Sequence, residues 1–200
     1  MNADQRLRWV FKPLLFVACL VPFLILLHGA VNNQLGANPV ERITHVTGEW
    51  TLRLLLVTLA MTPLRLVLGQ SWPIRIRRML GLFVFFYASV HFLNWAWLDR
   101  QWMWAEIVED IGKRPYITVG FTAWLLLLPL AVTSNRWSIR KLGKRWTTLH
   151  RVVYLVGMLG VLHFLWLVKA DLTEPLVYAA ILIVLLAMRT ARVKKLLAGR

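Results

Sequence analysis

Two histidines, His91 and His163, occupy matching positions in long apolar stretches of this sequence. His91 lies 11 residues beyond Leu80 and His163 lies 11 residues beyond Val152, and each stretch begins just after a basic cluster. At about 1.5 Å of rise per helical residue, both imidazoles would lie about 16 Å from the same membrane face. Two level imidazoles on neighbouring helices can hold one metal between them, and in a helical bundle this metal is typically haem iron. The spacing therefore predicts His91 and His163 as axial ligands of a b-type haem.

Other interpretations of these histidines stay open at this point. An intramembrane histidine can also act as a proton relay or as a hydrogen-bonded core residue, and neither role needs a second histidine at the same depth. Ala88 and Gly160 each precede one of the histidines by three residues, so they would share its helix face. Small residues there would leave space for a flat macrocycle, but they also suit ordinary helix packing in membranes.

A third histidine, His150, raises the question of a second cofactor. It precedes His163 by 13 residues, or about 20 Å along a helix, and this spacing turns an ideal helix by about 220°, so the two would not share a face. No histidine occurs at the same level in the third apolar stretch, where Arg77 and Arg78 stand instead. These arginines and Arg145 are candidates to pair with haem propionates or a flavin phosphate. A second haem, a flavin and a plain interfacial histidine all stay open.

The elements that must position these residues are membrane-spanning helices. With 58% hydrophobic residues and 11 Trp, the chain is too apolar for a soluble domain of 200 residues. A helix needs about 20 apolar residues to cross a bilayer. We predict an all-α membrane protein in which residues 1–200 form a single domain, a bundle of six transmembrane helices. The predicted helices cover residues 11–27, 50–68, 79–98, 117–132, 152–168 and 172–188.

The net charge of +15 is distributed as a membrane protein would distribute it. Most Lys and Arg residues fall in the N-terminal arm, the second and fourth connections and the tail, whereas every acid except Asp4 falls on the opposite side. Short basic loops stay in the cytoplasm, so both termini are expected there. This pattern argues against nucleic-acid binding. The outer loop 99–114 is the longest polar segment on the acidic side and is the expected docking place for an external partner.

Several motifs along the chain resemble those of one known family. They are Thr47-Gly48, Thr62-Pro63-Leu64, Arg77-Arg78-Met79-Leu80-Gly81 before His91, Arg114-Pro115-Tyr116, Leu142-Gly143-Lys144-Arg145-Trp146-Thr147-Thr148-Leu149-His150, and Val153-Tyr154-Leu155 followed by His163 and Trp166. The chain thereby resembles the MsrQ (YedZ) family, the haem-binding membrane subunits of the bacterial periplasmic methionine sulfoxide reductase system. This family belongs to the ferric-reductase-like transmembrane superfamily. In that superfamily two helices each supply two histidines. Here the third helix has only His91, so the two-haem arrangement does not transfer.

The resemblance implies an electron relay in the bacterial inner membrane. Such a subunit takes electrons from the quinone pool and passes them to a periplasmic, MsrP-like molybdopterin enzyme that reduces methionine sulfoxide in oxidised proteins. The family also implies FMN as a cofactor and a cytosolic flavin reductase as an alternative donor. The sequence has no Gly-rich nucleotide fingerprint, so the electrons are expected to come from a quinol or a separate protein rather than directly from a pyridine nucleotide.

Three other functions fit parts of the pattern. A stand-alone ferric or cupric reductase would also carry haem, but the sequence lacks a Met- or His-rich metal site on the acidic side. A proton-coupled transporter using histidine relays would be expected to carry an intramembrane carboxylate, and all nine acids lie outside the predicted membrane cores. A simple membrane anchor for a periplasmic enzyme would need none of the histidines. Whether the chain counts as an enzyme by itself is left open, because an electron-transfer subunit performs no bond chemistry on the final substrate.

Overall fold

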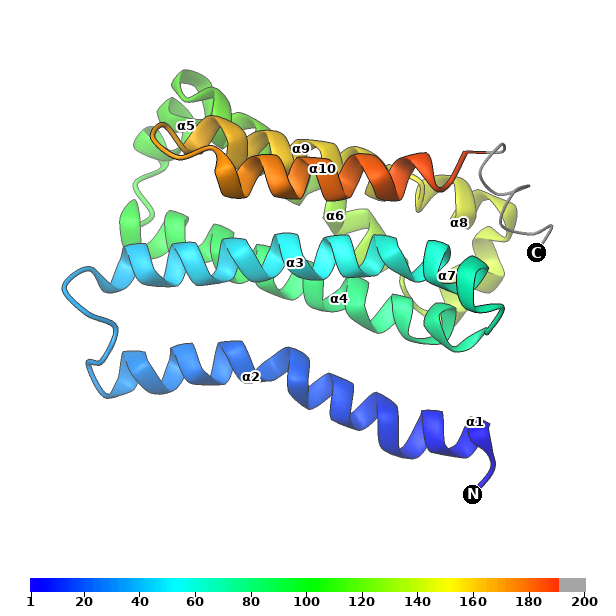
Figure 1. The fold of residues 1–200 in the computed structure, drawn as a ribbon. Helices are drawn as coiled ribbons and strands as arrows, with labels where there is room; N and C mark the ends of the chain where they lie inside the picture. The colour runs from blue at the N-terminus through cyan, green and yellow to red at the C-terminus, as the bar shows by residue number, and fades with distance from the viewer. Residues whose placement is uncertain (191–200) are drawn as a thin grey trace.

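The structure is a computed structural model that describes residues 1–190, which form helices joined by short connections (Figure 1). In chain order they are α1 (Ala3–Arg6), the π-helix η1 (Leu7–Phe11), α2 (Lys12–Val31), α3 (Pro39–Leu68), α4 (Trp72–Leu93), the π-helix η2 (Asn94–Asp99), α5 (Trp104–Lys113), α6 (Pro115–Val132), α7 (Arg136–Leu142), α8 (Lys144–Leu149), α9 (Val152–Leu167) and α10 (Thr173–Ala187). No strand occurs in this part of the chain, which confirms the predicted all-α class.

Five helical segments are long and apolar enough to cross a membrane, so this is a multi-pass membrane protein. They are Ala3–Val31, Pro39–Leu68, Trp72–Asp99, Pro115–Val132 and Lys144–Leu167. The sixth apolar helix, α10, has 15 residues and is about 22 Å long, which is shorter than a hydrocarbon core of about 30 Å. Each predicted stretch therefore coincides with a helix, and a sixth full crossing stays a prediction.

The helix α3 begins much earlier than the predicted residue 50. Asn38 caps it, because its side-chain oxygen accepts a hydrogen bond of 3.2 Å from a backbone N–H of the first turn, and Pro39 occupies the first helical position. The helix ends at Gly69, whose left-handed conformation (φ 66°) is typical of a helix C-terminus. The early start places Thr44 and Gly48 on a helix rather than in a loop.

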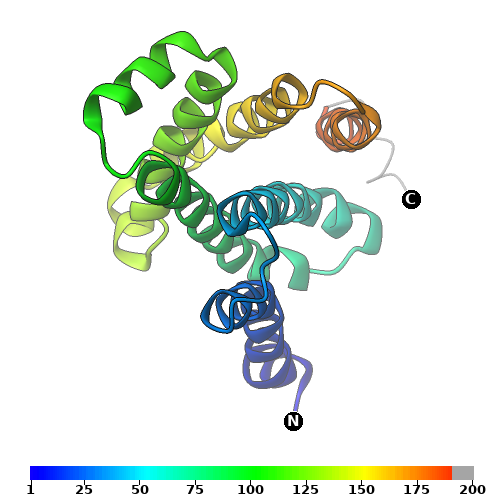
Figure 2. The same cartoon turned by 90° about the vertical axis from the view of Figure 1, so that its left-hand side faces the viewer.

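Two pairs of helices make up the centre of the bundle. The helix α3 packs along α4, and α6 packs along α9, while α4 and α6 join the two pairs. Viewed along the helices, α2 lies beside α3 and α4 at one edge, and α10 lies beyond α3 and α9 at another (Figure 2). Most of the largest fully buried side chains come from α3 and α4 (Leu59, Leu80, Val84 and Tyr87), and Val156 comes from α9. The α3–α4 pair is therefore the best-packed part of the protein.

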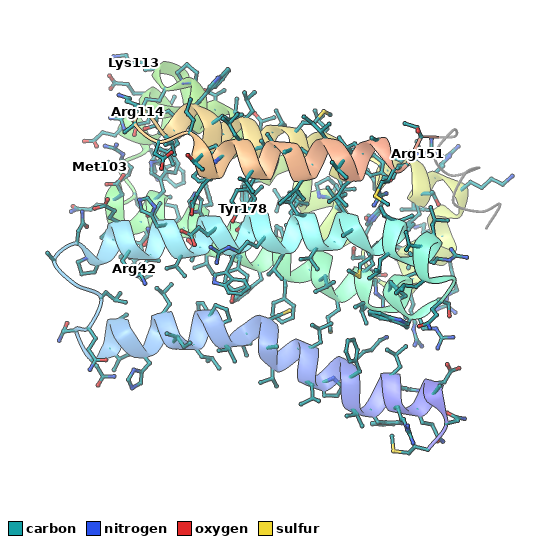
Figure 3. All side chains as sticks on the ribbon, viewed as in Figure 1. Arg42, Met103, Lys113, Arg114, Arg151 and Tyr178 are labelled. Carbon is teal, nitrogen blue, oxygen red and sulfur yellow. The ribbon has the colours of Figure 1, made fainter. Side chains whose placement is uncertain are left out.

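The basic and acidic connections lie at opposite ends of the bundle. One end holds the N-terminus, the α3–α4 connection, α7 and α8. The other end holds α5, the α2–α3 connection and the α9–α10 connection (Figures 1 and 3). At this second end, Asp110 pairs with Arg100 (2.7 Å) and Arg114 (3.2 Å). Beyond residue 190 the expected basic tail lies outside the described residues.

Candidate functional site

His91 of α4 and His163 of α9 come together near the end of the bundle that carries α5. Their ring centroids are 6.2 Å apart and their ring planes are at 88°. Metal–imidazole bonds of about 2 Å, with about 1 Å more from each nitrogen to its ring centre, need centroids about 6 Å apart. The two side chains therefore have the separation that a single metal between them requires.

Backbone carbonyls hold both rings in the orientation that a metal ligand needs. Nδ1 of His91 lies 3.0 Å from the carbonyl oxygen of Thr44, and Nδ1 of His163 lies 2.7 Å from that of Tyr116. Because a carbonyl only accepts hydrogen bonds, each Nδ1 is the protonated nitrogen and each Nε2 keeps its lone pair. Metal-bound histidines commonly have this arrangement, in which an outer partner fixes the tautomer. The residues present thus fit bis-histidine ligation of a haem iron.

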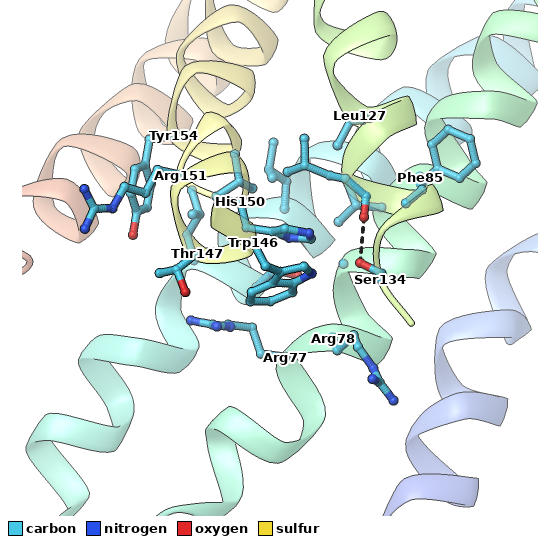
Figure 4. Close-up of a pocket in the computed structure, with 18 of the residues that line it drawn as sticks. Arg77, Arg78, Phe85, Leu127, Ser134, Trp146, Thr147, His150, Arg151 and Tyr154 are labelled. Carbon is cyan, nitrogen blue, oxygen red and sulfur yellow. Dashed lines mark hydrogen bonds between the residues drawn. The ribbon is translucent and has the colours of Figure 1, made fainter. Parts of the chain in front are cut away.

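The other end of the bundle contains a cavity of about 540 Å³ rich in cations. Residues of α3, α4, α6, α7, α8 and α9 line it (Figure 4), together with Arg189. Its cationic lining residues are Arg75, Arg77, Arg78, Arg151 and Arg189. No acid occurs among the described residues that line it. Arg75 pairs with Asp4, but no ion pair with a carboxylate occurs for the other four arginines among the described residues. Their positive charge therefore suits an anionic ligand.

His150 lies in this cavity, but its ring is held differently from the other two. Its Nε2 is 3.0 Å from the hydroxyl of Thr133, and this hydroxyl itself donates to the carbonyl of Pro129 (2.6 Å). The ring nitrogen of His150 is therefore the donor in this pair. Trp146 stacks on the imidazole with a centroid distance of 3.8 Å and an angle of 24° (Figure 4). His150 thus uses the nitrogen that His91 and His163 leave free.

The prediction that His150 and His163 do not share a helix face, made for an ideal helix, is wrong. His163 contacts Tyr116 at the start of α6, and His150 contacts Thr133 at the C-cap of the same helix. The two histidines are not on one continuous helix, because α8 ends at Leu149 and α9 begins only at Val152. One helix, α6, therefore faces both candidate sites.

The predicted arginines lie in different surroundings. Arg77 and Arg78 line the cavity, and Nη1 of Arg77 donates to the hydroxyl of Thr62 (3.1 Å). Arg145 is exposed and is not among the lining residues. Arg189, which was not among the predicted site residues, also lines the cavity and donates to the carbonyl of Leu59 (2.5 Å). Its only sequence signal was its place at the start of the basic tail.

The hydrogen-bond partners of His91 and His163 were not among the predicted residues either. Thr44 and Tyr116 act through their backbone carbonyls, so their side chains give no sign of the role. Tyr116 does occur in a motif that supports the family resemblance, in Arg114-Pro115-Tyr116. That motif was the one sequence signal that could have directed attention to this carbonyl.

Comparison with known proteins identifies the family of this chain. The model of the family described as "Ferric reductase like transmembrane component" matches residues 47–161, so the chain is a membrane protein of the ferric-reductase-like class. It is 54% identical over 182 residues to the protein-methionine-sulfoxide reductase heme-binding subunit MsrQ of Bordetella pertussis, covering 90% of this chain and 88% of the relative. The protein of the same name from Xanthomonas campestris pv. campestris is 58% identical over 158 residues, which are 79% of this chain and 72% of the relative. The chain belongs to the MsrQ family. No solved structure matches it.

Proposed function

We propose that this protein is a haem-binding electron-transfer subunit of a methionine sulfoxide reductase system, with one b-type haem between His91 and His163. The observation that carries the proposal is the 6.2 Å separation of two imidazoles whose Nδ1 atoms are both held by carbonyls. The names of its relatives, heme-binding subunits of such a reductase, support the same assignment.

The protein's part in this function is to hold and shield a one-electron carrier. Bound haem would supply the reversible iron couple, and His91 and His163 would hold it among apolar helices. His91 lies eight residues before the end of η2, or about 12 Å along the helix, and His163 lies four residues before the end of α9, or about 6 Å. The pair is therefore close to the acidic end of the bundle, where electrons would leave.

We place the acidic end in the periplasm and both termini in the cytoplasm, in the bacterial inner membrane. Support comes from the positive-inside rule, because the basic connections gather at the end that holds the N-terminus. In this orientation α5 and the loop around it face an external acceptor, an MsrP-like molybdopterin enzyme. Donors at the membrane would be quinol or a cytosolic flavin reductase.

The cavity beside His150 is proposed to hold a second cofactor with acidic groups. FMN and a second haem both fit this description, and the family implies the first. Arg77, Arg78 and Arg189 would bind the phosphate or propionates, and Trp146 offers a flat face for stacking. His150 precedes His163 by 13 residues, which is about 20 Å at the rise of a helix. A second cofactor beside His150 would therefore divide the electron path from the basic end to the histidine pair into two shorter steps.

The test of the main proposal is the visible spectrum of the purified chain. A dithionite-reduced b-type spectrum is expected, and it should be lost in His91→Ala and in His163→Ala but kept in His28→Ala and His45→Ala, whose side chains are exposed. A chain without such a spectrum would instead fit a transporter or a membrane anchor. Retention of haem in both ligand variants would overturn the assignment of the site.

Two further measurements separate the finer alternatives. Quinol-reduced protein should be reoxidised by a periplasmic methionine sulfoxide reductase, whereas reoxidation by ferric chelate alone would favour a stand-alone metalloreductase. Counting haem by pyridine haemochrome and FMN by fluorescence in His150→Ala tests the second cofactor. If both amounts equal those of the unmodified protein, no cofactor depends on His150.

A further inference from the structure

We propose that Gly48 and Gly120 are positioning residues for the two haem ligands, since each leaves the gap in a helix surface into which an imidazole fits. This inference rests on the proposed bis-histidine ligation. It concerns the neighbouring helices α3 and α6, which supply no ligand themselves. Without these gaps, each ring would have to shift relative to the carbonyl that orients it.

The closer of the two contacts is at Gly120. A Cβ atom built on this residue would lie 2.7 Å from Nδ1 of His163, 2.9 Å from Cε1 and 3.2 Å from Cγ. Separations below 3.0 Å are essentially never found for real Cβ atoms. An aromatic ring is rigid, so it cannot bend away from an added methyl group as a flexible side chain can. Any residue other than glycine at this position must push the His163 ring out of place.

Gly48 has the same relation to His91 with slightly more space. A Cβ atom there would lie 3.1 Å from Cε1 and 3.3 Å from Nδ1 of His91. These distances are tight but require a shift of only a few tenths of an ångström. An added methyl group should therefore displace the His91 ring at Gly48 less than it displaces the His163 ring at Gly120.

Each glycine is paired with the carbonyl that holds the same ring. Gly48 follows Thr44 by four residues, and Gly120 follows Tyr116 by four residues. Residues four apart lie next to each other on one helix face, so the acceptor and the gap adjoin. In both cases the histidine follows its acceptor residue by 47 positions. The α3–α4 pair and the α6–α9 pair thus hold their histidines by the same local arrangement.

The small residues on the histidines' own helices do not share this role. A Cβ atom on Gly160 would lie 3.6 Å from a side-chain carbon of Leu52 and 3.9 Å from one of Leu55, which are ordinary packing distances between α9 and α3. Of the two roles that the sequence leaves open for Gly160, these contacts support helix packing. Gly160→Ala is a matched control, because it adds the same methyl group close to the ligand in sequence.

The experiment compares Gly120→Ala, Gly48→Ala and Gly160→Ala in the full-length protein purified in detergent. Haem affinity is measured by titration, the midpoint potential by redox titration, and the ferric low-spin signal by electron paramagnetic resonance. The ring planes at 88° should give a strongly anisotropic signal that moves when one ring tilts. Loss of an outer partner of a metal ligand weakens metal binding by about tenfold or more, and we expect at least this for Gly120→Ala.

A graded result supports the proposal: a large effect at Gly120, a smaller shift of signal and potential at Gly48, and none at Gly160. Wild-type affinity, potential and signal in Gly120→Ala would overturn it. If Gly120→Ala does not give folded protein by circular dichroism and gel filtration, Gly48→Ala decides, and a Gly48→Ala protein identical to wild type would overturn the proposal. Haem loss in His91→Ala and His163→Ala tests the proposed function separately. A failure of the glycine proposal can therefore be distinguished from a failure of the haem assignment.

Discussion

The hydroxyl of Tyr87 donates a hydrogen bond of 2.8 Å to the carbonyl of Cys19, which connects α4 to α2 one helical turn before His91. The same hydroxyl accepts a hydrogen bond of 3.1 Å from the N–H of Phe23. In a regular helix the N–H of Phe23 would donate directly to the carbonyl of Cys19, four residues earlier. Pro22 lies in this turn of α2, and the Tyr87 hydroxyl is inserted where the helix's own bond would be. A fully buried side chain of the histidine-bearing helix therefore completes the hydrogen bonding of its neighbour.

Replacing Tyr87 with Phe should destabilise the attachment of α2. The substitution leaves the N–H of Phe23 and the carbonyl of Cys19 without their partner in an apolar environment, at a cost of about 1–3 kcal/mol. The expected result is a lower thermal midpoint in detergent and faster hydrogen exchange in α2. Tyr116→Phe is the control, because its hydroxyl is a long 3.4 Å from the exposed Arg114 guanidinium. Equal midpoints for the two variants would show that the bridge contributes nothing.

Asp110 should hold α5 against the rest of the acidic end. Its carboxylate, 9% exposed, contacts Arg100 before the helix (2.7 Å) and Arg114 after it (3.2 Å). Asp110→Asn keeps the shape and removes the charge. We expect the free energy of local unfolding of α5 to fall by about 1–2 kcal/mol. The effect is limited because the Arg114 side chain is about half exposed. Hydrogen exchange of residues 100–114 should then rise about 5- to 30-fold.

The control for this loop is Glu109→Gln. Glu109 also pairs with a cation four residues away, Lys113, but both side chains are mostly exposed. Such surface pairs contribute little, so exchange of the loop should stay as in the unmodified protein. The visible spectrum should be the same in both variants. An Asp110→Asn protein whose loop exchanges no faster than that of Glu109→Gln would show that the buried pair does not fix α5.

That His91 and His163 come together could be predicted from the sequence, because helix rise is constant and basic clusters mark where each apolar stretch begins. The partners of the two rings could not. Thr44 and Tyr116 accept through backbone carbonyls, which every residue has, so no residue type signals them. The early start of α3 also escaped prediction, because polar residues between positions 39 and 50 resemble a loop in composition although Asn38 caps a helix there.

The orientation of His150 shows a different limit of sequence reasoning. Helical periodicity predicts which side chains share a face only while the helix is continuous. The interruption between α8 and α9 therefore removes the basis for relating His150 to His163. The cavity at the basic end depends on tertiary contact for the same reason. Arg77 and Arg189 both line it although they are far apart in the sequence, and no local pattern relates them.

Arg77 and Arg189 should determine whether the basic-end cavity binds an anionic cofactor. Both line the cavity, whereas Arg145 is exposed and does not. Each hydrogen bond from a guanidinium to a phosphate or carboxylate contributes about 1.5–3 kcal/mol, or roughly tenfold or more in affinity. Arg77→Gln and Arg189→Gln should therefore weaken FMN binding to the purified protein by at least about tenfold in a fluorescence titration.

The matched control is Arg145→Gln, which removes an equal charge from the same end of the protein. It should leave FMN affinity unchanged within about twofold, because an exposed charge outside the cavity is screened by salt. Raising the salt concentration distinguishes the two kinds of arginine further, since contacts within a cavity are screened less than surface charges. Equal loss of affinity in Arg145→Gln and Arg77→Gln would mean that FMN is attracted by the general positive charge of this end and does not enter the cavity. Unchanged affinity in Arg189→Gln with loss in Arg77→Gln would restrict the anion to the α4 side of the cavity.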